Sequence, residues 1–428
     1  MLHATLHGRD HARGPTGFYS PRVRLYLAMF MMSCAVLVIA PMAPVIQQSH
    51  GFPVASLGII FGVSLLTGVV TELFVGPQAD RGHERLLLIL SVVLAVATLV
   101  GSGAADSVLA LTFWRALAGV AYGMFVPSAS AIVIRSGADG VGERIARLQV
   151  AEFAGFAAGP FLGALLLSRF GSTHGLELAG LAAIVLLPVV MGVRIPRAPA
   201  PDSAAGPESA APRERPSILA FDLLRHRAVW VVLLLSVAVT APVGTYNAIW
   251  PRFLADRGAS AFVIAASLAI FTLPFMVIAP VAGRFVDRVG PMRGSVWGIW
   301  IVAIIVMAYG LIGSVSAIIA VSLIESVGQA LAGPGTAAAM ARVSGAERAG
   351  SGQGLSRGVG FLGAGLTAFA AGPVYQYWGA RAVFGATALM MIALVVIAYL
   401  LARTWAPELN RPVVDEAPTG DVAAQAAE

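Results

Sequence analysis

Apolar runs of about 20 residues recur along nearly the whole chain, and this feature constrains the fold more than any other. A helix of about 20 apolar residues is long enough to cross the hydrocarbon core of a bilayer. Of the 428 residues, 58% are hydrophobic and only 12% are charged, whereas soluble domains carry about 25% charged residues. A water-soluble fold of this length would have too few charged residues to cover its surface. The sequence therefore predicts a polytopic membrane protein.

The membrane-spanning segments are expected to be helices. Backbone groups inside lipid must be hydrogen-bonded within their own segment, and a helix achieves this. The alternating segments of about ten residues that typify membrane barrels are not seen. We predict an all-α membrane protein with twelve transmembrane helices at 24–47, 55–77, 86–104, 108–133, 146–169, 177–195, 228–250, 262–285, 294–313, 316–340, 352–375 and 381–402.

Arginine placement predicts the orientation of these helices. Most arginines fall in alternate loops, and the intervening loops hold only Arg169, Arg252, Arg257 and Arg381. Because basic residues accumulate in cytoplasmic loops, both termini should be cytoplasmic in a bacterial inner membrane. The formal charge of +6 is thereby assigned to helix orientation, and no nucleic-acid partner is expected.

The longest interruption between apolar runs divides the chain. It begins with a Pro/Ala/Ser-rich stretch typical of a disordered linker, and it ends with Ile218, Phe221 and Leu224 at the spacing of a short helix on the membrane surface. The predicted organisation is a cytoplasmic N-terminal tail at 1–23, a six-helix bundle at 24–195, a cytoplasmic linker at 196–227, a second six-helix bundle at 228–403 and a disordered cytoplasmic tail at 404–428.

The two predicted bundles resemble each other in sequence. GPQADRGHER (76–85) returns as GRFVDRVGPMR (283–293), with Asp80 and Asp287 207 residues apart. Pro127 and Pro334 share the same spacing. Two similar six-helix halves joined by a linker are the layout of transporters built from parallel repeats.

The loop after the second predicted helix carries a family motif. Its pattern G-x-x-x-D-R-x-G-R-K is matched at the Gly, Asp, first Arg and last basic position, and the second copy matches more closely. With these motifs the chain resembles the major facilitator superfamily over residues 24–403. The resemblance implies that Asp80 clamps the start of helix 11 when the cytoplasmic side is closed; the alternative is a topology determinant without a gating role. The gating set is Asp80, Arg81, Arg85, Asp287 and Arg288.

A second motif places a charge inside the fourth predicted helix. LTFWRALAGVAYG (111–123) is similar to the family pattern l-x-x-x-R-x-x-q-G, with Ala118 in place of the usual Gln. Arg115 lies about 10 Å from the helix end, where a charge costs about 2.5–3.5 kcal/mol on the insertion scale. It must face a wet cavity or a partner. The resemblance implies a role in proton coupling; the alternative is a structural Arg that binds backbone carbonyls.

A third motif in the fifth predicted helix indicates the direction of transport. Gly155, Gly159, Pro160 and Gly163 look like the antiporter motif g-x-x-x-G-P-x-x-G-G, with Ala164 in place of the last Gly. Small residues four apart allow close helix packing, and the proline introduces a kink. The resemblance implies export of a small molecule.

Ionisable residues inside predicted spans are functional candidates because they are costly there. We predict that Glu325 carries a proton across the central cavity, with Arg115 as the opposing cation; a structural Glu is the alternative. Glu152 is a second proton site or extends its carboxylate toward the interface. Helices 2 and 11 are neighbours in this fold, so Glu72 and Arg357 are a candidate ion pair of a cytoplasmic gate.

The substrate cavity is expected to be apolar and aromatic. Tyr122, Tyr246, Asn247 and Gln329 are its candidate lining residues, although Tyr246 equally suits the aromatic belt at the membrane surface. A cavity with few fixed charges suits lipophilic or weakly polar ligands.

These observations favour a monomeric, proton-coupled exporter of the drug/proton antiporter type that works by alternating access. The alternative within the same fold is a proton symporter that imports a small metabolite. A membrane enzyme or receptor is disfavoured because the loops show no nucleotide-binding, metal-ligating or nucleophile-base pattern. The residues alone leave open a lipid scramblase or flippase. No cofactor, metal or catalytic residue is expected; the partners are a small-molecule substrate, protons and the bilayer.

Overall fold

The computed structural model describes residues 21–78, 82–136, 141–193, 221–345 and 348–410, and regular structure within these ranges is helical. The first half contains α1 (Pro21–Leu37), η1 (Ala40–Met42), α2 (Ala43–Ser49), α3 (Ala55–Gln78), α4 (Glu84–Gly103), α5 (Val108–Arg135), α6 (Val141–Ala183) and α7 (Leu186–Met191). The second half contains η4 (Phe221–Arg225), α8 (Arg227–Ala255), α9 (Ala261–Val289), α10 (Pro291–Tyr309), α11 (Val315–Ser344), α12 (Ala349–Trp405) and η6 (Pro407–Asn410).

These elements make twelve membrane crossings. Within the described residues, nine stretches are long and apolar enough to span a bilayer. The stretches that include α6 and α12 each contain two crossings, because Gly171 (φ 74°) and Gly379 (φ 76°) reverse the helix direction. Glycine adopts this backbone conformation without steric cost. The 29-residue α9 supplies the remaining crossing. The predicted all-α fold of twelve transmembrane helices is confirmed.

Some predicted boundaries were wrong. The helix expected at 24–47 is interrupted between α1 and α2, because Pro41 and Pro44 cannot donate backbone hydrogen bonds. The helix expected at 177–195 starts directly after Gly171 and is interrupted again before α7. Of the predicted surface helix, the described part is the 3-10 helix η4, whose Leu223 is buried against the second half. Ile218 lies outside the described residues.

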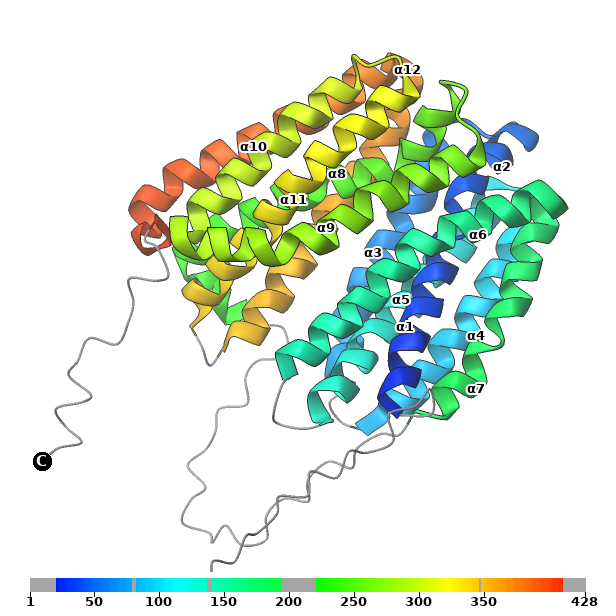
Figure 1. The fold of residues 1–428 in the computed structure, drawn as a ribbon, viewed down its shortest axis with the longest axis horizontal. Helices are drawn as coiled ribbons and strands as arrows, with labels where there is room; N and C mark the ends of the chain where they lie inside the picture. The colour runs from blue at the N-terminus through cyan, green and yellow to red at the C-terminus, as the bar shows by residue number, and fades with distance from the viewer. Residues whose placement is uncertain (1–20, 79–81, 137–140, 194–220, 346–347, 411–428) are drawn as a thin grey trace, which may run out of the picture.

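The two halves approach each other at one end and diverge at the other (Figure 1). We call the end where α2 finishes and α3 begins the distal end, and the end where α7 finishes and α8 begins the linker end. In Figure 1 the distal ends of both bundles meet at the upper right. The linker ends of the second half point left, and those of the first half point down.

Glycines hold neighbouring helices of each half in close contact. A Cβ added to Gly155, Gly159 or Gly163 of α6 would collide with the α1 segment at the carbonyl oxygens of Phe30, Cys34 and Val38. The equivalent contact in the second half joins α8 to α12. There a Cβ on Gly244 would meet the carbonyl oxygen of Ala364, and the Thr240 hydroxyl donates to the Gly360 carbonyl at 2.6 Å.

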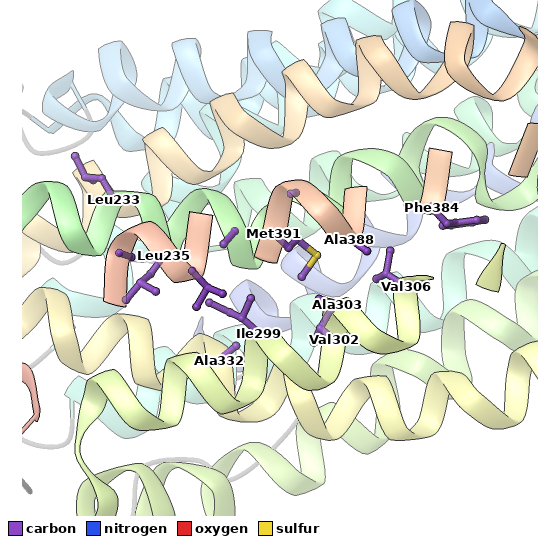
Figure 2. Close-up of a cluster of buried hydrophobic side chains, with 14 of the residues drawn as sticks. Leu233, Leu235, Ile299, Val302, Ala303, Val306, Ala332, Phe384, Ala388 and Met391 are labelled. Atoms are coloured by element: carbon purple, nitrogen blue, oxygen red, sulfur yellow. The ribbon is translucent and has the colours of Figure 1, made fainter. Parts of the chain in front are cut away.

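The second half encloses a continuous apolar core. Most of its buried residues come from α8, α10, α11 and α12, which converge on Ile299, Val302 and Met391 (Figure 2). The first half has two smaller clusters, one around Met29 and Phe125 and one around Ile39 and Phe61. Each half is therefore packed as a bundle of its own.

The sequence repeat extends to the turns of the backbone. Positive-φ glycines at the distal end, Gly51 and Gly258, are 207 residues apart, and α5 and α11 begin at Val108 and Val315 with the same spacing. This spacing relates the positions of α4 and α5 to those of α10 and α11, because α4 and α10 begin at Glu84 and Pro291, also 207 residues apart.

Candidate coupling and gating sites

Glu325 lies at the centre of a buried polar cluster in the second half. Its side chain extends from α11 and is only 1% exposed. The Tyr246 hydroxyl of α8 donates to Oε1 at 2.6 Å, and the Tyr309 hydroxyl of α10 donates to Oε2 at 2.5 Å. Trp250 and Phe384 pack against Tyr309. Within the described residues the carboxylate makes no ion pair, so two phenols in an aromatic shell are what stabilise its charge.

Glu152 belongs to a second cluster that faces the other half. Tyr122 of α5 donates a hydrogen bond to its carboxylate, and the Tyr122 ring packs against Phe156 of α6. Arg357 of α12 lies within electrostatic range of both Glu152 and Tyr122. Two carboxylates, Glu152 and Glu72, thus share one guanidinium across the interface between the halves.

The structure brings Glu72 and Arg357 together. The Arg357 Nε atom lies 3.7 Å from Glu72 Oε1, and the side chains are 40% and 34% exposed respectively. The Arg357 guanidinium also lies 5.7 Å from the centre of the Phe361 ring. The contact joins α3 to α12, as expected for helices 2 and 11. Its long distance and its exposure make it a weak ion pair by itself.

Arg115 is buried inside the first half. The side chain is 5% exposed, and its guanidinium carbon lies 5.2 Å from the centre of the Phe61 ring. Its Nε atom has no hydrogen-bond partner, and no ion pair reaches it within the described residues. It borders a small cavity between α1, α4 and α5.

The predicted opposition of Arg115 and Glu325 across a central cavity is not found. Arg115 faces α1 and α4 of its own half, whereas Glu325 faces the tyrosines of α8 and α10. Their depth in the membrane follows from their positions along the helices. The direction of each side chain depends on the rotation of its helix, and both side chains point into their own bundle. The two residues therefore cannot act as a direct pair in this conformation.

The predicted lining residues differ in their surroundings. Tyr246 is half-buried and binds Glu325, so it is more than a belt residue. Asn247 donates to the Val243 carbonyl of its own helix at 2.9 Å. Gln329 is buried. Tyr122 and Tyr246 are the two of these four that contact a candidate proton-carrying residue.

The structure describes only part of the two copies of the loop motif, at 76–85 and 283–293. Asp80 and Arg81 lie outside the described residues. Arg85 donates to the Met191 carbonyl at 2.8 Å, which caps the C-terminus of α7 within the first half. Asp287 and Arg288 are exposed in the last turn of α9. These positions supply no contact between the halves in the part of the chain that the structure describes.

A polar network at the distal end joins the halves and was not predicted. Arg252 of α8 donates to the Gln47 Oε1 atom of α2 at 2.6 Å and lies 2.7 Å from Asp256 Oδ1. The Tyr375 hydroxyl of α12 donates to the other oxygen of Asp256 at 2.7 Å. Arg252 is one of only four arginines in the predicted non-cytoplasmic loops. Its rarity there was the sequence feature that could have indicated a specific role.

Backbone contacts reinforce this distal connection. The Ala55 amide donates to Gln376 Oε1 at 2.8 Å. A Cβ on Gly58 would lie 2.5 Å from the Ala368 carbonyl oxygen, so α3 and α12 almost touch here. Toward the linker end, a Cβ on Gly358 would meet only side-chain atoms, at 3.8 Å or more. The two helices therefore separate progressively from the distal end.

Two packed six-helix bundles, with ionisable residues buried within and between them, have the architecture of membrane proteins built from two parallel repeats. The sequence profile of the Major Facilitator Superfamily matches residues 25–249 and 232–425. The chain belongs to this superfamily and is a multi-pass membrane protein.

Curated relatives match part of the chain. An uncharacterised MFS-type transporter, YuxJ of Bacillus subtilis, is 26% identical over 226 residues, which are 50% of this chain and 55% of the relative. The 4-hydroxybenzoate transporter PcaK of Pseudomonas aeruginosa is 31% identical over 189 residues, 42% of this chain and 41% of the relative. The multidrug resistance protein MdtG of Dickeya zeae is 24% identical over 241 residues, 55% and 57%. The chain thus spans about half the length of these relatives.

Solved structures share the fold at low sequence identity. A bacterial homologue of the human lysosomal transporter Spinster, in an inward-facing and occupied conformation, superposes with a TM-score of 0.76 at 16% identity, covering 93% of this chain and 100% of that one. The nucleoside transporter NupG gives a TM-score of 0.70 at 14% identity, covering 89% and 99%.

Proposed function

We propose that this protein is a proton-coupled exporter of small, lipophilic molecules. The observation that carries the proposal is Glu325, a buried carboxylate that is held by two tyrosine hydroxyls and forms no ion pair with any described residue. A charge in such a place is costly, and binding a proton removes it. A residue that alternates between these two states can couple a proton to a conformational change.

The arrangement of the halves supports alternating access. The distal ends are joined by the Arg252 network and the α3–α12 contact, while the linker ends diverge (Figure 1). We assign the linker end to the cytoplasm, because arginines are concentrated there. This conformation would receive substrate from the cytoplasm. Opening the distal contacts would release it outside.

The direction of export has two supports. The glycines of the antiporter motif make a very close contact between α6 and α1, as that motif predicts. MdtG, a multidrug resistance protein, is among the relatives. Import by proton symport is the second candidate, because PcaK, a 4-hydroxybenzoate transporter, is also similar to this chain.

A lipophilic substrate is favoured by the side chains at the interface between the halves. The Phe156 ring contacts both Tyr122 and Phe153 on the first half, and Phe361 lies beside Arg357 on the second. Aromatic faces contribute large apolar contact areas. The adjoining Glu152 and Glu72 would favour neutral or cationic compounds over anions.

Inverted membrane vesicles provide the test. Respiration acidifies their interior, and a fluorescent pH reporter follows protons released when single lipophilic compounds are added. We expect release in wild type and its loss in Glu325→Gln, with Glu177→Gln, a partly exposed acid of the distal end, as the matched control. Full pH-driven transport by Glu325→Gln would remove this residue from the coupling mechanism. Substrate-dependent proton uptake in the opposite direction would establish the importer.

A further inference from the structure

The cavity beside Arg115 is a candidate site of its own. It lies between α1, α4 and α5, and every residue that lines it belongs to the first half. Its lining includes Met32, Val36, Thr98, Ser102, Arg115 and Ala118. The cavity measures about 10 Å³, which is room for a particle of about the size of one water molecule. An organic substrate does not fit this space.

The charge on Arg115 needs a counterpart there. Burial of an unpaired guanidinium carries a large desolvation cost, and a partner of opposite charge repays part of it. Within the described residues no carboxylate pairs with this side chain, and its Nε atom is without a hydrogen bond. The Phe61 ring face supplies only a weak cation–π contact at 5.2 Å.

The repeat shows what occupies the equivalent place in the second half. At the spacing of 207 residues, Ala118 corresponds to Glu325 and Ser102 corresponds to Tyr309. In the second half the Glu325 carboxylate fills this place and accepts a hydrogen bond from Tyr309. In the first half both positions carry small side chains that border the cavity. In the second half the anion is the Glu325 side chain. In the first half the cation Arg115 lies beside a cavity instead.

We propose that the first half binds chloride between Arg115 and Ser102. Chloride is somewhat larger than a water molecule, so flexible lining side chains such as Met32 must move slightly to admit it. The guanidinium supplies the charge, and the Ser102 hydroxyl supplies a hydrogen bond. Thr98 donates to the Ala95 carbonyl of its own helix and contributes only its position. The anion takes the place that the Glu325 carboxylate takes in the other half. It would stabilise the first half whichever way the substrate moves.

The experiment measures thermal unfolding of the purified full-length protein in sodium chloride and in sodium gluconate at equal ionic strength. Wild type should unfold about 2–4 °C higher in chloride. Arg115→Gln should remove this difference. Ala118→Glu should also unfold at the same temperature in both salts, because its carboxylate replaces the anion. That temperature should equal the one at which wild type unfolds in chloride. Ala118→Gln is the uncharged control of equal size and should unfold lower in both salts.

Two outcomes would overturn the site. One is a wild-type protein that unfolds at the same temperature in both salts. The other is a chloride effect that persists in Arg115→Gln or, should that variant not fold, in Ala118→Glu. The assay measures stability and requires no transport. A negative result for the anion site is therefore distinguishable from a negative result for the proposed exporter function.

Discussion

At the scale of single residues, the two halves stabilise buried charge in different ways. Glu325 receives two hydroxyl donors, whereas Arg115 has an aromatic ring and a cavity. The acid at the interface, Glu152, combines one tyrosine with a guanidinium from the other half. Such differences decide which group can change its protonation state without leaving its neighbours unpaired.

Tyr309→Phe should destabilise the protein through Glu325. The change removes a hydrogen bond to a charged group, which is worth about 1.5–3 kcal/mol, and leaves the ring packing intact. The same change should cost less in a Glu325→Gln background, where the acceptor is neutral. Thermal unfolding of the four proteins measures this coupling as a double-mutant cycle. Tyr377→Phe, at a 70% exposed tyrosine, is the control; equal losses in both backgrounds would show that Tyr309 acts independently of Glu325.

Exchange of the charges at Glu72 and Arg357 should restore transport. Glu72→Lys places two cations opposite each other, and Arg357→Glu adds a third acid beside Glu72 and Glu152. The double variant recreates an opposite-charge pair in reverse. Stability should change little, by about 0.2–1 kcal/mol, because the pair is partly exposed. Vesicle transport is the relevant measurement, and a double variant no better than either single one would refute the pairing.

At the scale of the helices, glycine contacts determine how closely neighbours approach. Gly163→Ala should destabilise the protein, because its Cβ would overlap the Val38 carbonyl oxygen. Overpacking of this kind costs about 1–3 kcal/mol. Gly385→Ala is the matched control, since a Cβ there meets no atom within 4 Å and alanine favours a helix. A similar unfolding temperature for both variants would contradict the close α1–α6 contact.

The helices could be predicted from apolar length alone, and the repeat was sufficient to predict two halves. The helices are interrupted at Pro41 and Gly171 because of the backbone properties of proline and glycine. An apolar run shows no break at these residues, so hydrophobicity alone could not predict the interruptions. The side chains around Glu325 could not be predicted, because Tyr309 contacts it only through the rotation of α10 against α11. The distal network depends on how two bundles meet, and no periodicity within one helix encodes that.

At the scale of the whole molecule, the contacts between the halves are unevenly distributed. The distal end has the Arg252 network and a backbone-to-backbone approach of α3 and α12. The linker end has the weak Glu72–Arg357 contact. An alternating-access cycle must open the first set of contacts and close the linker ends, with each bundle moving as a unit because each has its own core.

A covalent link at the distal end should therefore stop transport. Ala55→Cys and Gln376→Cys are introduced together in a Cys34→Ser background, at positions joined by a 2.8 Å hydrogen bond. A short bifunctional thiol reagent should link them in a large fraction of molecules and abolish transport in vesicles. The single-cysteine variants, treated identically, should keep their activity. If the linked protein transported at the wild-type rate, the distal ends would not separate during the cycle, because the link fixes α3 to α12 in the closed arrangement.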